Sequence, residues 1–377
     1  MRTLTREAAL PETLALAPTP AAERHARGRL PSLTGMRWAA AFLVFAFHTY
    51  KFGYYGPEDE KLVSWAARSG SAGVMFFFVL SGFVLAWSAR PGDRYLSFMR
   101  RRLARVYPLH LVTAAAALAL AFTALPWLRE GERDGLKAVT ANLLLVSSWK
   151  FEWWQTGNPV SWSLVCEVFF YACFPLLHWA LRRPGPRGLT GVAALCVLTV
   201  MVQPYVYKAL HVDVFLYSFP LARLPEFVLG VAVGRIVQLG RWRGPGLEGA
   251  MALTLIGYFA APLVRSGLTW TPLIGLTCLI AAGAVADVNG QPSMWRRPSL
   301  VKLGEWSFAF YMVHLLVMHT LTLWVGEKPR LDTIGAFGTA GSAFVVSLAL
   351  SALLYRLVEE PGRRLFLGKK RLSGRPA

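Results

Sequence analysis

Six ionisable side chains lie inside long apolar stretches of the sequence, where a charged group is costly and usually functional. They are Arg37, His48, Glu167, Arg223, Glu226 and His314. An imidazole can act as a general base, and a carboxylate can orient that base. An arginine can stabilise negative charge as it develops. The residue types therefore indicate a site for proton transfer and group transfer.

Arg37 and His48 are eleven residues apart, so in one helix they point from nearly the same face, about 16 Å apart along the axis. With Arg37 at the cytoplasmic edge, His48 lies near or beyond the middle of the membrane. We predict that His48 is a catalytic base. In the alternative interpretation, Arg37 only anchors the topology and His48 is a hydrogen-bonded core histidine.

Ser163, Glu167 and Tyr171 are spaced by four residues and share a helical face. Their helix is predicted to run inward from the outer side, which places Glu167 about 12 Å deep. We therefore expect Glu167 to approach His48 and orient it. The alternative is an ion pair with Arg223 or Arg37 that only holds the fold.

Arg223 and Glu226 are three residues apart and also share a face. Two prolines, Pro220 and Pro225, flank them, so this helix is expected to kink and open a polar cavity. The pair is a candidate for substrate binding, with a structural role as the alternative.

Ser307, Tyr311 and His314 follow at spacings of four and three on a later helix. We predict that Tyr311 and His314 contact substrate. An interhelical hydrogen-bond cluster is the alternative.

The segment 90–105 holds six arginines, more than membrane topology requires. They are Arg90, Arg94, Arg100, Arg101, Arg102 and Arg105. Because guanidinium groups bind phosphate through two hydrogen bonds, the cluster fits a ligand with several phosphates. Acidic lipid headgroups are the rival partner.

The elements that must position these residues are membrane-spanning helices. Of the 377 residues, 55% are apolar and only 16% are charged, against about 25% charged residues in soluble domains. This argues against a soluble enzyme and against disorder. We predict an all-α, polytopic transmembrane bundle with ten apolar spans and a short re-entrant or interfacial helix at 138–149. The spans are 33–52, 70–89, 105–127, 159–181, 189–207, 212–236, 248–265, 268–288, 305–325 and 335–357.

The basic residues set the topology of these spans. With both termini in the cytoplasm, 28 Lys and Arg lie on the inside and 11 on the outside, as the positive-inside rule requires. The net charge of +19 therefore indicates contact with membrane lipids, not with nucleic acid. We divide the chain into a disordered cytoplasmic tail (1–30), a membrane domain (31–365) and a basic tail (366–377). The excess of Arg over Lys is typical of GC-rich bacterial genomes, so we place the protein in the bacterial cytoplasmic membrane.

Several other classes of protein do not fit the sequence. The four cysteines form no CxxC pair, so neither a disulfide framework nor a metal site is expected. GxSxG, HExxH and Walker motifs are absent, which argues against soluble hydrolases and metalloenzymes. The sequence has no internal repeat of the kind found in inverted-repeat transporters.

The motifs occur in the order typical of a known family, and the chain resembles the acyltransferase-3 family of integral membrane O-acyltransferases. The matching pieces are 33–37 with His48, 73–83, 101–108, 161–164 with Glu167 and 170–171, Arg223 with 226–230, 303–307 with Tyr311 and His314, and 355–361. Together they cover about residues 32–365. The chain departs from the family's larger members because no further spans and no esterase-like domain follow residue 377.

The resemblance implies acyl-CoA as a co-substrate that enters from the cytoplasm, with no permanently bound cofactor. It also implies that Arg37, His48, Arg101 and Arg105 are needed for activity. Members of this size include those that acylate macrolides and other polyketides, and others acylate carbohydrates or cell-surface glycans.

The resulting hypothesis is an acyl-CoA-dependent O-acyltransferase with His48 as general base, Glu167 orienting it, and Arg37 or Arg223 stabilising the oxyanion. Arg101, Arg102, Arg105 and Ser81 would bind the donor. Arg223, Glu226, Ser163, Tyr171, Tyr311 and His314 would contact substrate. A transporter or lipid flippase, and a non-catalytic scaffold, are the rival classes. The oligomeric state is left open.

Overall fold

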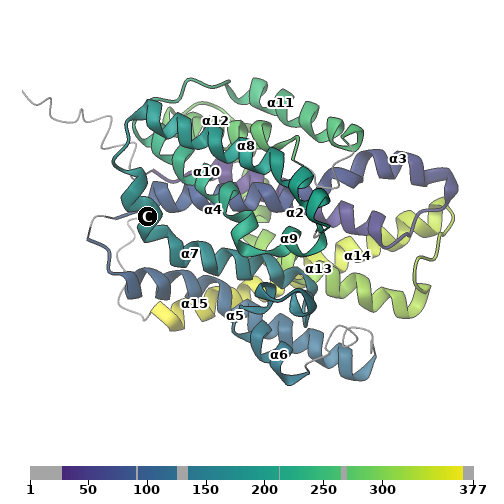
Figure 1. Ribbon diagram of the computed structural model, residues 1–377. Helices are drawn as coiled ribbons and strands as arrows, with labels where there is room; N and C mark the ends of the chain where they lie inside the picture. The colour runs from purple at the N-terminus through teal and green to yellow at the C-terminus, as the bar shows by residue number, and fades with distance from the viewer. Residues whose placement is uncertain (1–27, 91, 125–134, 212, 265–269, 368–377) are drawn as a thin grey trace, which may run out of the picture.

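The protein is a bundle of helices, and the described residues form no β-strand. The computed structural model describes residues 28–90, 92–124, 135–211, 213–264 and 270–367. Its α-helices, most of which lie side by side in Figure 1, are α2 (Pro31–Lys51), α3 (Pro57–Ala67), α4 (Ala72–Ser88), α5 (Tyr95–Thr123), α6 (Leu136–Leu143), α7 (Trp162–Leu181), α8 (Pro186–Leu210), α9 (Asp213–Ser218), α10 (Pro220–Gln238), α11 (Leu247–Ala260), α12 (Leu273–Val288), α13 (Pro298–Val325), α14 (Thr333–Leu354) and α15 (Glu360–Leu367).

The predicted all-α polytopic bundle is confirmed, and each of the ten predicted spans coincides with helix. Seven stretches of the described chain are long and apolar enough to cross a membrane by themselves. The other three spans are α2, which is 21 residues long and carries Arg37 and His48, and the shorter apolar helices α11 and α12. The chain is therefore a multi-pass membrane protein.

Several predicted boundaries are wrong. Helix α13 begins at Pro298, seven residues before the predicted span. Helix α5 begins at Tyr95, ten residues before the predicted span, because the arginines continue the helix beyond its apolar part. The predicted span 212–236 is broken at Phe219 into α9 and α10, since the residue before a proline disfavours the helical conformation. The two predicted tails lie almost wholly outside the described residues, apart from 28–30 and the last residues of α15.

The segment predicted not to span, 138–149, contains only the eight-residue helix α6 followed by 3-10 turns. Hydrogen bonds from α5 hold it. The Tyr107 hydroxyl donates to the Leu143 carbonyl (2.6 Å), and His110 Nε2 donates to the Asn142 carbonyl (3.0 Å). Helix α6 is about 12 Å long, so it cannot cross a membrane.

Contacts between helix ends define two ends of the bundle. At the end that we call the basic end, the Ser32 amide at the start of α2 donates to Asp287 at the end of α12 (2.8 Å). At the opposite, outer end, Tyr55 after α2 pairs with Leu331 before α14. This agrees with the predicted alternation of the spans, in which α2 and α13 both run outward from the basic side.

The core contains an unusually close contact between α4 and α10. A Cβ atom added to Gly82 would lie 2.0 Å from the Phe227 carbonyl oxygen, and one added to Gly230 would lie 1.9 Å from the Val79 carbonyl oxygen. Small residues let helix backbones approach in this way in membranes. The contact fixes the rotation of α4 about its axis, and therefore the direction in which Ser81 points.

This contact predicts that Gly230→Ala destabilises the protein. Neither backbone can move away cheaply, so overpacking is expected to cost about 1–3 kcal/mol. Gly338→Ala is the matched control, because a Cβ at this glycine of α14 would meet nothing within 4 Å. The measurement is the midpoint of thermal unfolding in detergent. Equal midpoints for the two variants would contradict the prediction.

Candidate functional site

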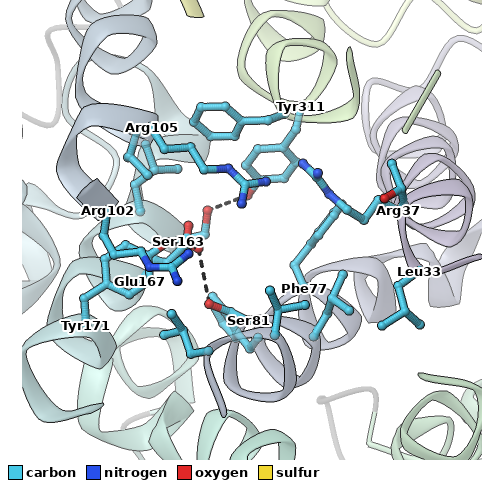
Figure 2. Close-up of a pocket in the computed structure, with 18 of the residues that line it drawn as sticks. Leu33, Arg37, Phe77, Ser81, Arg102, Arg105, Ser163, Glu167, Tyr171 and Tyr311 are labelled. Atoms are coloured by element: carbon cyan, nitrogen blue, oxygen red, sulfur yellow. Dashed lines mark hydrogen bonds between the residues drawn. The ribbon is translucent and has the colours of Figure 1, made fainter. Parts of the chain in front are cut away.

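A cavity of about 350 Å³ lies among α2, α4, α5, α7 and α13 (Figure 2). Its wall includes Gly28 and Trp87 at the basic end and reaches Val74 near the start of α4. On α4 alone, Val74 to Trp87 covers about 20 Å. Eight predicted site residues line it: Arg37, Ser81, Arg102, Arg105, Ser163, Glu167, Tyr171 and Tyr311.

Three guanidinium groups share this cavity. Arg37 enters from the side opposite to Arg102 and Arg105 (Figure 2). Because α5 already begins at Tyr95, Arg102 and Arg105 lie on its first turns and share a face at a spacing of three. The donor role predicted for Arg101 is not supported, since that side chain does not line the cavity and pairs with Asp93 instead.

Glu167 is the carboxylate among the cavity's arginines. It accepts hydrogen bonds from the Tyr171 hydroxyl and from Ser81 Oγ (3.3 Å). The predicted contact with His48 does not form. Ser163 on α7 contacts Tyr311 on α13, so these two residues lie at the same depth. Glu167 lies one turn closer to the basic end than Ser163. His314, which contacts His48, lies nearly one turn further outward than Tyr311. Glu167 and His314 are therefore about 10 Å apart along the bundle. The alternative ion pair with Arg223 does not form either, because Arg223 pairs with Glu226.

His48 does not line the cavity but lies beyond its outer end, opposite the arginines. The cavity face of α2, which includes Leu33 and Arg37, continues outward to His48 at the helical spacing. His48 Nδ1 lies 2.9 Å from the Val44 carbonyl oxygen and 3.1 Å from His314 Nε2. The centres of the two imidazole rings are 5.0 Å apart. His314 was predicted to contact substrate, and it contacts His48 instead.

Tyr311 stands between the cavity and the two histidines. Its ring lines the cavity and lies 5.9 Å from the His314 ring. Its hydroxyl oxygen is 2.8 Å from Ser163 Oγ. Tyr311 therefore contacts both the cavity and the imidazole that bonds His48. Ser307, one turn earlier, donates to the carbonyl of Gly304 in its own helix (2.8 Å) and has no other hydrogen bond to the described part of the chain.

Arg223 and Glu226 form a buried ion pair (3.2 Å) away from this cavity. The Arg223 guanidinium also lies over the rings of Phe78 and Tyr217, at 5.5 and 5.4 Å. Arg223 borders a separate hollow of about 20 Å³, which is too small for a substrate. A role in holding α10 thus accounts for this pair better than the predicted substrate contact.

Sequence reasoning missed two contributors to the site. Phe77 lines the cavity and lies 6.1 Å from the Tyr311 ring. Glu359, which is buried in a π-helical turn (Tyr355–Glu359), has Arg37 and Arg105 as electrostatic neighbours. The only sequence feature that pointed to Glu359 was its position in the matching piece 355–361. Among the described residues, no three His, Cys, Asp or Glu side chains gather as metal ligands would.

Comparison with known proteins gives one consistent family. A family model described as an acyltransferase domain matches residues 30–356. Acyltransferase MdmB of Streptomyces mycarofaciens is 38% identical over 366 residues, which cover 91% of this chain and 94% of the relative. Exopolysaccharide production protein ExoZ of Rhizobium meliloti is 28% identical, over 82% of this chain and 95% of the relative.

Peptidoglycan O-acetyltransferase OatA of Listeria monocytogenes is 26% identical over 90% of this chain but only 57% of its own length. No solved structure matches the chain.

Proposed function

Because the chain belongs to the acyltransferase-3 family of integral membrane O-acyltransferases, we propose that it moves an acyl group from acyl-CoA to a hydroxyl of a small-molecule acceptor. The observation that carries this proposal is the cavity that runs from three arginines toward His48. In the bacterial cytoplasmic membrane, its basic end would face the cytoplasm, where acyl-CoA is made.

The cavity suits the donor's chemistry. Arg102 and Arg105, with Arg37 opposite, would bind the phosphates of CoA through charge-assisted hydrogen bonds. The polar groups of Glu167, Ser81 and Tyr171 would face the amides of the pantetheine arm. Val74, Phe77 and other apolar residues of the outer part of the wall would exclude water from the thioester.

Acyl transfer then needs a base near the thioester carbon. His48 Nε2 would take the proton of the acceptor hydroxyl while its oxygen attacks that carbon. As the carbon–oxygen bond forms and the carbon–sulfur bond breaks, the CoA thiolate receives the proton from Nε2. Arg37 lies about 16 Å from His48 along α2, so its charge is better placed for the donor's phosphates than for the oxyanion. The variant mechanism passes through acyl-His48.

We propose a macrolide or another polyketide as the acceptor. The alignment with the Streptomyces relative covers 91% of the chain and 94% of that relative, and the family that the chain resembles includes members that acylate macrolides. The alternative acceptor is a carbohydrate or cell-surface glycan, which the names of the Rhizobium and Listeria relatives favour.

The test is thioester cleavage by the purified protein in detergent. With acyl-CoA and a polyketide alcohol, free thiol and acylated product are expected in equal amounts, measured by a thiol reagent and by mass spectrometry. A transporter or flippase would release no thiol. Thiol release with a glycan acceptor only would exclude the polyketide. Labelled acyl retained on the protein without an acceptor would favour the acyl-His48 variant.

A further inference from the structure

We infer that His314, a neutral buried imidazole, is the positioning partner of His48 and takes the place expected for Glu167. This inference rests on the proposed role of His48 as base. It goes beyond that role because it fixes which ring nitrogen of His48 reacts and what holds the ring. The argument follows from which groups can donate and which can only accept hydrogen bonds.

The hydrogen bonds of His314 settle its own tautomer. Its Nδ1 lies 2.8 Å from the Tyr311 carbonyl oxygen and 3.3 Å from the Phe310 carbonyl oxygen. A carbonyl oxygen can only accept, so His314 Nδ1 carries the hydrogen. The ring is 0% exposed, and no carboxylate of the described residues contacts it. A buried unpaired charge is costly, so the ring is neutral and its Nε2 is an acceptor.

The tautomer of His48 follows from this. Its Nδ1 faces two acceptors, the Val44 carbonyl oxygen at 2.9 Å and His314 Nε2 at 3.1 Å. Nδ1 must therefore donate, and Nε2 keeps the free lone pair that a base needs. No described residue forms a hydrogen bond with this Nε2. His48 is also only half-buried, whereas His314 is wholly buried.

Packing holds the pair in this arrangement. The His314 ring stacks on Phe310 (6.1 Å, 12° between planes), and Phe45 lies against its edge (6.3 Å). His48 is flanked by Phe47 (5.2 Å). When Nε2 of His48 takes a proton, the hydrogen bond from Nδ1 to His314 becomes charge-assisted and strengthens. His314 would thus stabilise the transition state without touching the substrate.

The kinetic test compares His314→Leu with His314→Gln. Leucine fills the space but accepts no hydrogen bond, so kcat is expected to fall by about 10- to 100-fold with little change in KM for acyl-CoA. Glutamine offers an amide oxygen near the position of Nε2 and should restore most of kcat. His178→Leu removes an imidazole that stacks on Phe174 (5.4 Å), and it should leave kcat unchanged.

A second readout does not depend on activity. In protein labelled with ¹⁵N-histidine, a nitrogen–nitrogen coupling through the His48–His314 hydrogen bond is expected in NMR spectra and should vanish in His314→Leu. No coupling in the wild type, an unchanged kcat in His314→Leu, or a folded His314→Gln as inactive as the leucine variant would overturn the inference. If acyl-CoA proves not to be the donor, the coupling still tests the pair.

Discussion

His48→Ala should lower kcat/KM for acyl transfer by about 10²–10⁴-fold, the usual contribution of a general base, while the protein still folds. The side chain is half-buried, and its two hydrogen bonds go to Val44 in its own helix and to His314. Its loss therefore leaves the packing of α2 on α13 largely intact. The measurement is initial-rate kinetics beside thermal unfolding in detergent.

His48→Gln sharpens this experiment. Glutamine keeps a polar group of similar length that can still bond His314, but it cannot take a proton at neutral pH. A loss of activity equal to that of the alanine variant assigns the effect to the base and not to a cavity in the core. Near-wild-type turnover in either variant would end the assignment of His48 as base.

The fold was predictable because membrane helices follow from composition. Runs of about 20 apolar residues and the distribution of Lys and Arg were enough to place all ten spans. The errors were at boundaries, where a helix continues beyond the apolar run that predicted it. Helix α13 begins at Pro298, not at 305, and α5 begins at Tyr95.

The position of one boundary bears on the partner of His48. Helices α2 and α13 both run outward from the basic end, and His48 and His314 are the eighteenth and seventeenth residues of α2 and α13. They therefore lie at equal depth. A helix starting at residue 305 would put His314 about 10 Å closer to the basic end than it lies, so the predicted boundary did not place it beside His48. That α2 and α13 are neighbours, with the two rings facing each other, follows only from the structure.

The arginine cluster predicted the kind of ligand but not which arginines face it. Six arginines in one segment indicated phosphate binding, yet which of them face the ligand depends on where helix α5 begins. As a loop, 90–105 could have presented any of them. As a helix from Tyr95, it directs Arg102 and Arg105 into the cavity and leaves Arg101 with Asp93. This difference makes the donor site testable with neighbouring residues.

Replacing Arg102 and Arg105 together by alanine should raise KM for acyl-CoA by about 10²-fold or more, since each charge-assisted hydrogen bond to phosphate contributes about 1.5–3 kcal/mol. KM for the acceptor should change little, because the two arginines lie at the basic end, far from His48. Arg101→Ala is the matched control from the same helix turn, and its effect should be small. Equal increases in both KM values, or an equally large effect of Arg101→Ala, would show that the cavity's arginines do not select the donor's phosphates.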